Sequence, residues 1–590
     1  MEKYKKYART SLALAIMSII TPSVSANHLL QNEQGYEEIV PELRAFSELA
    51  QQVRYFYPSN AVANSDWDSF LRDSFKVLRD TPSEQRVDKG IELIQAIAPY
   101  VQRNVIHLPS VENDESVNVW IQSGASTNHI YFRDLTTGTF QELTQFPYFT
   151  QQTYFASTYQ GRDIYIPLYL PIDSALLGTA YQAGNPYNLV TNMTGTETCM
   201  AAVSSMWAEI QHFWPYFGHV DVNWSQTHLP LFNACIGARN EFEYKVNEQF
   251  SLLGDNHVWI NYPEEIVPFK HYKLPFTLSY IDEKALVVNR TDFLSLQVEL
   301  GDELISIDGQ TIDYWLDYYK GRTLKAGLTE KEQSLNLLTR YTDSRLVNMV
   351  FRKSSGEEYG VTSATVHYKV TGPYKGQGVV PHYSELVRYH ENGVAQLMAY
   401  NVTVNNLPDV KRLLEKASAI VIDFRHYPTS FQGWKQLFAW LLSTEAKSGT
   451  LDFRYQMMPD QTEKFDYTFR QTITPEGAGV NIPLVALSSR SSISQNEHAL
   501  MFLQDANIPI LGVPTAGING DIVYSHKFGG YQQGGISYIY TGMSARQTNG
   551  EALIGVGVLP DMYAPRTAKS IENQEDNQLI QGISYLKKQL

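Results

Sequence analysis

Ser494 has the surroundings that best suit a nucleophilic serine in this sequence. It follows an apolar run, Leu484–Leu487, that predicts a strand, and it precedes Glu497–Gln504, which predicts a helix. A serine at such a junction exposes its hydroxyl beside the free N–H groups of the helix start, which can receive a developing oxyanion. Ser494-x-x-Glu497 is also the pattern of a capping box, which needs no catalytic role. Taken alone, the pattern favours the cap.

A nucleophilic serine needs a base, and His257 is the candidate. The hydroxyl is a weak nucleophile until a neighbouring group accepts its proton, and an imidazole can do so near neutral pH. His257 ends the segment Leu253-Gly254-Asp255-Asn256-His257. A lone histidine is more often structural, so the case for His257 depends on where this segment lies.

An internal repeat places that segment. Residues 40–105 and 197–260 share an apolar stripe with helical spacing, followed by a proline and a tryptophan. The stripe residues Phe46, Leu49, Val53, Phe56, Pro58 and Trp67 recur 157 positions later as Val203, Met206, Ile210, Phe213, Pro215 and Trp224. Aligning the ends of the copies with a three-residue deletion puts Arg103 opposite His257. The histidine therefore belongs to one copy only, which indicates a task beyond packing.

Other segments predict the elements around these residues. Residues 116–180 alternate apolar and polar side chains, as short antiparallel strands do. Gly301–Gly309 predicts a strand closed by an Asp-Gly turn. From about residue 392, strands and helices alternate, which predicts a mostly parallel sheet covered by helices. The predicted strands are 394–400, 420–424, 484–487 and 508–513, and the predicted helices are 407–417, 431–442 and 497–504.

The beginning of the chain predicts export. Four basic residues precede an apolar run of about ten residues, Ser11–Ile20, and Val24-Ser25-Ala26 offers small residues for cleavage. The run is too short for a membrane-spanning helix, which needs about 20 residues. We therefore expect a signal peptide at 1–26 and a periplasmic or extracellular protein without a membrane span. Export makes a Cys199–Cys235 disulfide feasible, but two buried free thiols fit the sequence equally well.

Composition limits the function classes. The 590 residues predict several domains, and the formal net charge of −15 argues against nucleic acid as the main partner. HExxH is absent and the two cysteines form no CxxC pair, so no metal site is predicted. Aromatic residues make up 12% of the chain, which keeps carbohydrate or another apolar ligand open.

Six fragments, taken together, resemble the tail-specific (carboxyl-terminal-processing) protease family over roughly residues 197–565. They are Phe213-x-Pro215-Tyr216 with Trp224, the Gly254–His257 segment, Gly301–Gly309, Val421–Pro428, Ile493–Glu497 with Gly512–Gly517, and Gly557-Val558-Leu559-Pro560-Asp561. Each fragment is weak alone, but six in the family's order are specific.

The resemblance implies a serine peptidase without a cofactor, whose nucleophile is Ser494. The loop Thr515–Gly520 holds no lysine, and the nearest, Lys527, lies on the next predicted strand. The sequence is therefore similar to the tricorn-like, retinoid-binding-protein-like branch, in which His257 is the base. The amide of Gln495 and one near Thr429 would form the oxyanion hole. That branch has a carboxylate where Ile554 stands, so Glu497 or Glu551 would have to orient His257.

The expected architecture is multidomain α+β and α/β, with a crotonase-like α/β catalytic core, a PDZ-like module and a helical and β-rich N-terminal half. The expected segments are 1–26, 27–195, 196–265 with His257, 266–375 as the PDZ-like domain, 376–575 as the catalytic domain, and a tail at 576–590. The predicted function is hydrolysis of peptide bonds in extended or unfolded polypeptides. Two alternatives remain open: a catalytically impaired peptide-binding relative, and an aromatic-rich carbohydrate or ligand binder. The oligomeric state is not predicted.

Overall fold

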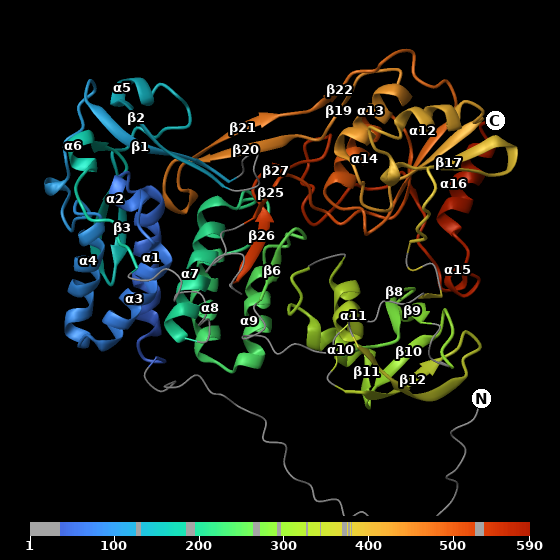
Figure 1. Cartoon of the computed structure of the whole chain (residues 1–590), viewed down its shortest axis with the longest axis horizontal. Helices are drawn as coiled ribbons and strands as arrows, with labels where there is room; N and C mark the ends of the chain where they lie inside the picture. The colour runs from blue at the N-terminus through green and yellow to red at the C-terminus, as the bar shows by residue number, and fades with distance from the viewer. Residues whose placement is uncertain are drawn as a thin grey trace, which may run out of the picture.

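The computed structural model describes most of the chain beyond residue 35. The described ranges are 36–124, 131–183, 195–262, 272–291, 297–325, 329–340, 342, 344–367, 374–375, 378, 380–524 and 536–590. The predicted signal peptide and Lys527 lie outside them. Figure 1 shows three regions: a helical region on the left, an α/β region at the upper right and a smaller β-rich region at the lower right.

The helical region contains both copies of the repeat. α1 (Val40–Phe56) packs against its counterpart α7 (Thr196–Phe213). Both apolar stripes are buried there, as an amphipathic helix requires. Ser47 and Ser204, which are 157 positions apart, hydrogen-bond to each other across this contact. The first copy continues with α3 (Trp67–Asp80) and α4 (Arg86–Ile97), and the second with η5 (Trp224–Thr227), α8 (His228–Ile236) and α9 (Arg239–Ser251).

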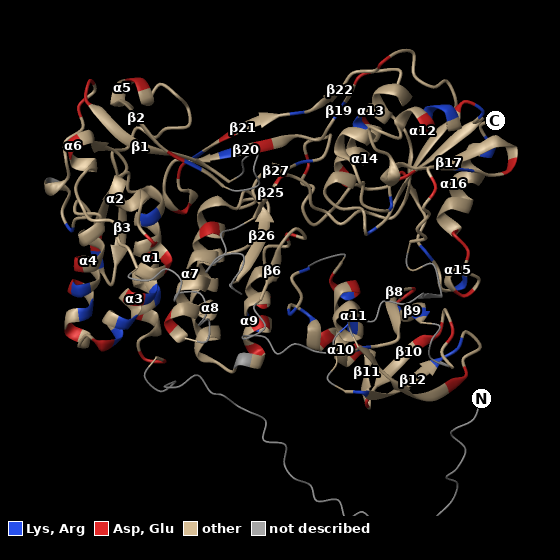
Figure 2. Cartoon of the chain, viewed as in Figure 1, with Lys and Arg blue, Asp and Glu red and all other residues tan. Residues whose placement is uncertain are grey.

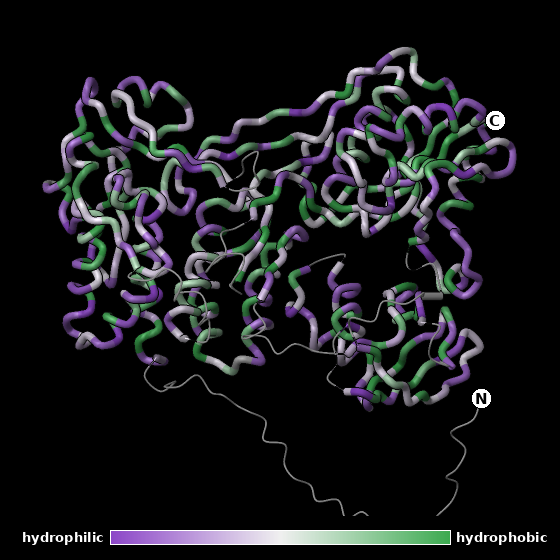
Figure 3. Tube along the Cα trace, in the orientation of Figure 1, coloured by the Kyte–Doolittle hydropathy of each residue, from purple (hydrophilic) through white to green (hydrophobic). Residues whose placement is uncertain are grey.

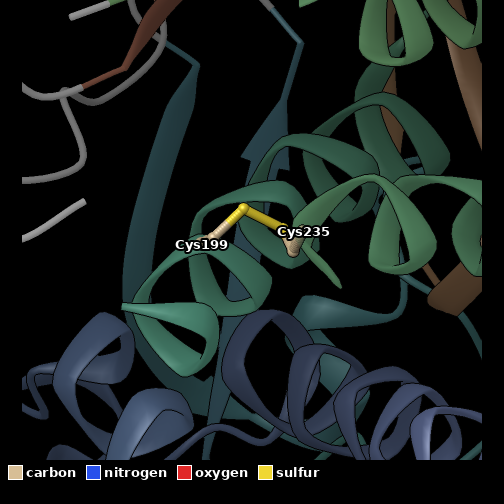
Figure 4. Close-up of a disulfide and its surroundings, with 2 residues drawn as sticks. All are labelled: Cys199 and Cys235. Carbon is tan, nitrogen blue, oxygen red and sulfur yellow. A yellow bond between two sulfur atoms is a disulfide. The ribbon is translucent and has the colours of Figure 1, made fainter. Parts of the chain in front are cut away.

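A disulfide joins two helices of the second copy. Cys199 on α7 and Cys235 on α8 are bonded, with their Cα atoms 5.7 Å apart (Figure 4). This settles the choice that the sequence left open between a disulfide and two free thiols.

Antiparallel strands cover the helices, as the alternation predicted. β1 (Ser116–Ser123) pairs with β2 (Phe132–Thr139), and β3 (Tyr154–Tyr159) pairs with β4 (Arg162–Pro167). An unpredicted ribbon joins this sheet from the C-terminal half, namely β20 (Leu451–Gln456) and β21 (Lys464–Phe469), which pair with each other. β20 meets β1 at Ser123 and Tyr455. The ribbon runs from the α/β region to the helical region in Figure 1 and ends in η9 (Pro459–Gln461).

The lower β-rich region is a twisted antiparallel sheet with two helices. Its strand order is β13-β12-β10-β9-β15, with β8 beside β9 and β11 beside β10. The predicted Asp-Gly turn is present, since Asp308 and Gly309 have φ angles of 46° and 83° between β10 and β11. The elements are β8 (Phe276–Ile281), β9 (Lys284–Thr291), β10 (Glu303–Ile307), β11 (Gln310–Thr311), α10 (Ile312–Tyr319), α11 (Glu330–Arg340), β12 (Leu346–Arg352), β13 (Glu358–Ala364) and β15 (Tyr374–Lys375).

The α/β region has a six-stranded sheet of order β16-β17-β18-β23-β24-β28, parallel from β17 to β28. This agrees with the predicted alternation. One face packs on α12, α13 and α14, and the other on α16, so the central strands are mostly apolar (Figure 3). The elements are β16 (Val387–Tyr389), β17 (Val394–Met398), α12 (Leu407–Leu414), β18 (Ala419–Asp423), α13 (Phe431–Leu441), β23 (Leu484–Ser488), α14 (Gln495–Asp505), β24 (Ile510–Gly512), β28 (Met562–Tyr563), α15 (Ala568–Glu572) and α16 (Asn577–Lys587).

Acidic and basic residues alternate along α3 and α4 (Figure 2). No helix in the described ranges is long and apolar enough to cross a membrane.

Candidate active site

Ser494 lies on a strained turn between β23 and α14. Its backbone has φ 58° and ψ −110°, a left-handed conformation that costs energy for any residue with a side chain. Hydrogen bonds hold it there, because the Ser494 N–H points at the Ile518 carbonyl, 2.9 Å away, and at the Glu497 carboxylate, 3.0 Å away. Ser494 is half-buried, and α14 begins at the next residue. This is the geometry of a nucleophile elbow, which turns a serine hydroxyl out of the chain.

Glu497 fixes that turn and does not contact His257. Its carboxylate is buried and accepts hydrogen bonds from Thr515 Oγ1 at 2.5 Å and from the amides of Gly517, Ile518 and Ser494 at 2.8, 3.0 and 3.0 Å. Burial raises the pKa of Glu497 to about 7, although these four donors oppose the rise. The prediction that Glu497 could orient the histidine is therefore wrong, since both of its oxygens hold the 515–518 loop.

Asp255 orients His257 instead, through Thr541. His257 Nδ1 lies 2.8 Å from Thr541 Oγ1, and this hydroxyl donates to Asp255 Oδ1 at 2.9 Å. Since the hydroxyl proton goes to the carboxylate, Thr541 can only accept from Nδ1. His257 therefore carries its proton on Nδ1 and presents the lone pair of Nε2, as a base must. Asp255 is held by further donors, the Trp214 indole and the Thr541 amide, each 3.0 Å away.

Burial sets the protonation of His257. It lowers the pKa of His257 to about 4, with Asp255 opposing the shift and Lys325 adding to it. The Lys325 ammonium reaches this segment from the β-rich region and donates to the carbonyls of Asn256 and Val258, the latter at 3.2 Å. The imidazole is therefore neutral at pH 7.

One loop connects the segment of His257 to that of Ser494. The Asn256 side chain donates to the Ala516 carbonyl at 2.7 Å, and the Ala516 amide donates to the Ser492 carbonyl at 2.9 Å. Ser494 and His257 are thus attached to the same loop, but the structure does not join them directly. The Nε2 of His257 is buried and has no hydrogen-bond partner among the described residues.

Only one of the two predicted oxyanion donors is free. No acceptor faces the Gln495 amide in the described structure, as expected at the first position of α14. The Thr429 amide donates to the Tyr400 carbonyl at 2.9 Å. Thr429 is therefore unsuited to the predicted role, because its N–H is already bonded within the fold.

The region around residue 554 supplies no carboxylate either. Ile554 is 7% exposed and belongs to the hydrophobic core, while Glu551 lies on an exposed turn and is bonded to Asn549. Glu551 is therefore also excluded as the orienting group. Sequence reasoning missed Asp255 and Thr541. Asp255 could have been considered, because it lies two residues before the histidine, but Thr541 carries no local signal.

Among the described residues, no group of three or more His, Cys, Asp and Glu side chains could hold a metal ion.

Comparisons with known proteins give the fold. Mature CPAF matches with a TM-score of 0.54 at 14% sequence identity, covering 67% of this chain and 97% of CPAF. Mature CPAF complexed with lactacystin matches with a TM-score of 0.53 at 14% identity and the same coverage. The photosystem II D1 C-terminal processing protease matches with a TM-score of 0.34 at 14% identity, covering 66% of this chain and 98% of that one. No family model and no curated protein matches the sequence. The chain therefore has a fold like that of the tail-specific proteases, as the sequence predicted.

Proposed function

We propose that this protein is an exported serine-type peptidase that cleaves extended or unfolded polypeptides, with Ser494 as nucleophile and His257 as general base. The observation that carries the proposal is the strained backbone of Ser494 at the start of α14, held by Ile518 and by the buried Glu497. A capping serine needs no left-handed backbone, so the strain favours catalysis over the purely structural interpretation.

In the proposed mechanism, His257 Nε2 accepts the Ser494 hydroxyl proton as Oγ attacks the carbonyl carbon of the scissile bond. The oxyanion accepts a hydrogen bond from the Gln495 amide, a donor of the kind whose loss typically slows acyl transfer by about 10²–10³-fold. The imidazolium is stabilised by Asp255 through Thr541. It then gives the proton to the leaving amine as the tetrahedral intermediate collapses. His257 then accepts a proton from water, and the hydroxide attacks the carbonyl carbon of the acyl-enzyme. The imidazolium returns the proton to Ser494 Oγ as its bond to the acyl carbon breaks.

Residues 266–375, whose described part forms the lower β-rich region, are proposed as a PDZ-like module. Its antiparallel sheet and the Gly301–Gly309 turn support this assignment. Such a module binds the end of a polypeptide by adding it as a strand to the sheet. The Cys199–Cys235 disulfide supports export, because disulfides persist in oxidising compartments.

A second candidate function is peptide binding without catalysis. It is favoured by the missing hydrogen bond between Ser494 and His257 and by the occupied amide of Thr429. Catalytic hydrogen bonds are often long in the absence of substrate, which is why the first proposal is preferred. The two tryptophans of residues 27–195 offer no exposed ring for a carbohydrate: Trp67 is 5% exposed, and the Arg133 guanidinium covers Trp120 at 3.4 Å.

Hydrolysis of an unfolded substrate tests the proposal. Reduced, carboxymethylated lactalbumin is incubated with the protein from residue 27 onward and with its Ser494→Ala variant, and fragments are identified by mass spectrometry. We expect lactalbumin fragments in the incubation with the parent protein and none with Ser494→Ala. The parent protein should cleave native, disulfide-bonded lactalbumin more slowly. Binding of the unfolded substrate without fragments would instead support the non-catalytic candidate.

A further inference from the structure

A cavity of about 500 Å³ opens between the two copies of the helical repeat. α1 and α7 form two of its walls, the β3–β4 hairpin forms another, and Asp460 of η9 contributes from the tip of the β20–β21 ribbon. Its volume lies in the range of small-ligand sites. Neither Ser494 nor His257 lines it, so it is separate from the candidate active site.

The walls combine aromatic rings with carboxylates. Phe155, Tyr165 and Trp207 line the cavity together with Glu48, Asp163 and Asp460. No lysine or arginine is among the lining residues, all of which belong to the described structure. Carboxylates with aromatic rings around them attract organic cations, by charge and through the negative faces of the rings.

Nearby histidines leave this negative charge in place. The ring of His228 stacks on Trp207 with centroids 3.9 Å apart, and burial lowers its pKa. Burial likewise lowers the pKa of His212, which neighbours Asp460, to about 4. Both rings are therefore neutral at pH 7. Arg44 pairs with Glu48 from outside the lining and partly compensates the negative charge of the carboxylates.

Hydrogen bonds join several polar side chains that line the cavity. The side-chain amides of Gln52 and Gln211 donate to Asp460 at 3.0 and 3.3 Å, and Ser157 donates to the Gln52 carbonyl at 2.7 Å. These bonds order one wall but bring no positive charge. A neutral ligand would leave three carboxylates around a half-enclosed space, whereas a cation would offset their repulsion.

We propose that this cavity is a binding site for an organic cation, an ammonium or guanidinium group on an aliphatic chain. Two sources share this chemistry: a lysine or arginine side chain of a polypeptide, and a free aliphatic diamine. The carboxylates bind the charged head, and the rings of Phe155, Tyr165 and Trp207 contact the chain that carries it.

Isothermal titration calorimetry of the protein from residue 27 onward tests this site. The probes are acetyl-Gly-Lys-Gly-amide, its arginine analogue, 1,5-diaminopentane, and acetyl-Gly-norleucine-Gly-amide as the uncharged control. We expect the cationic probes to bind and the norleucine peptide to bind at least tenfold more weakly, with the difference shrinking as salt is raised. Tighter binding of the peptides identifies a polypeptide as the source, and tighter binding of the diamine identifies a free amine.

Two variants locate the binding. Glu48→Gln and Asp163→Asn should each weaken the cationic probes about three- to tenfold, while Glu92→Gln, on the exposed side of α4, should leave the affinity unchanged. Asp163 is exposed, so its variant tests the site even if Glu48→Gln fails to fold. Absence of heat from every cationic probe at 10 mM, equal binding of the norleucine peptide, or preferential binding of a neutral disaccharide such as maltose would overturn the proposal.

Discussion

The two copies of the helical repeat share a scaffold but end differently. α1 and α7 bury matching stripes and meet at the equivalent pair Ser47 and Ser204. The second copy then continues into Asp255–His257 and the short strand β6 (Trp259–Asn261), which pairs with β26 (Ser537–Thr541), the strand of Thr541. The first copy ends at Gln102, which bridges to Tyr165 of β4, and at Arg103, which pairs with Asp88 on the surface.

In the proposed function, only one copy of the duplicated unit contributes to the chemistry. Packing needs the apolar stripe, and both copies keep it. The proposed chemistry needs a histidine, a carboxylate and a hydroxyl in line. The hydroxyl comes from Thr541 of β26, which pairs with the strand β6 that follows the second copy.

The largest predicted contrast is between the ends of the copies. Ser494→Ala and His257→Ala should each lower peptidase activity about 10³-fold or more, because the two residues act as a unit. Arg103→Ala should leave activity unchanged, since an exposed ion pair contributes little to stability. The rate of cleavage of a fluorogenic peptide measures all three. Equal losses at Arg103 and His257 would contradict the assignment of chemistry to the second copy.

The Glu497→Gln substitution should have the second largest effect. Glu497→Gln replaces an acceptor by an amide group among four donors, so we expect a loss of about 2–4 kcal/mol in the free energy of unfolding. Activity should fall with it, because the turn at Ser494 loses its anchor. Glu551→Gln, on an exposed turn, is the control and should change stability by less than about 0.5 kcal/mol. Urea unfolding compares them, and equal stabilities would refute the anchoring role.

The disulfide is a stabilising link that the second copy has and the first copy lacks. Positions 157 residues before Cys199 and Cys235 hold Glu42 and Leu78, so the first copy lacks the link. The double variant Cys199→Ser, Cys235→Ser should lose about 2–4 kcal/mol of unfolding free energy. Dithiothreitol should destabilise the parent protein and leave the variant unaffected. Identical unfolding midpoints of parent and variant would show that the link adds nothing.

Thr541 tests how His257 is oriented. Thr541→Val removes the acceptor for Nδ1–H, so the tautomer is no longer fixed. A hydrogen bond of about 1.5–3 kcal/mol to a charged group corresponds to a decrease of about ten- to hundredfold in kcat. Thr541→Ser keeps the hydroxyl and should restore most of the activity. If the Thr541→Val and Thr541→Ser variants have the same kcat, Asp255 does not act on His257 through Thr541.

The smallest effect is on pH dependence. Because the pKa of His257 is about 4, lowering the pH from 7 to 5.5 leaves the base neutral. The pKa of Glu497 is about 7, so the test uses Glu497→Gln, which lacks this carboxylate, and its kcat/KM should fall less than about twofold. A histidine with an ordinary pKa near 6.5 would lose about eightfold over the same range. The shift also means that this group's contribution to stability is present above pH 6.5 and lost as the pH falls towards 4. An acidic limb near pH 6.5 in Glu497→Gln would show that the ring is less buried than in the structure.

Local patterns predicted much of the fold, and long-range contacts explain what they missed. The strands and helices after residue 392 and the Asp308–Gly309 turn follow from periodicity and turn chemistry, which act over a few residues. The β20–β21 ribbon could not be predicted from local patterns, because its pairing with β1 joins Ser123 to Tyr455, which are far apart in the sequence. Thr541 lies 286 positions from Asp255, so only the folded chain brings the two together. The roles of Glu497 and Thr429 depended on backbone partners that no side-chain pattern reveals.

Labelling with a fluorophosphonate probe tests the proposed active site most directly. The probe bonds covalently to an activated serine, so the parent protein should be labelled and mass spectrometry should find the adduct on Ser494. Ser494→Ala and His257→Ala, shown to be folded by their unfolding curves, should not react. No labelling of the folded parent protein, or labelling that persists in Ser494→Ala, would contradict the assignment of Ser494 as a nucleophile activated by His257.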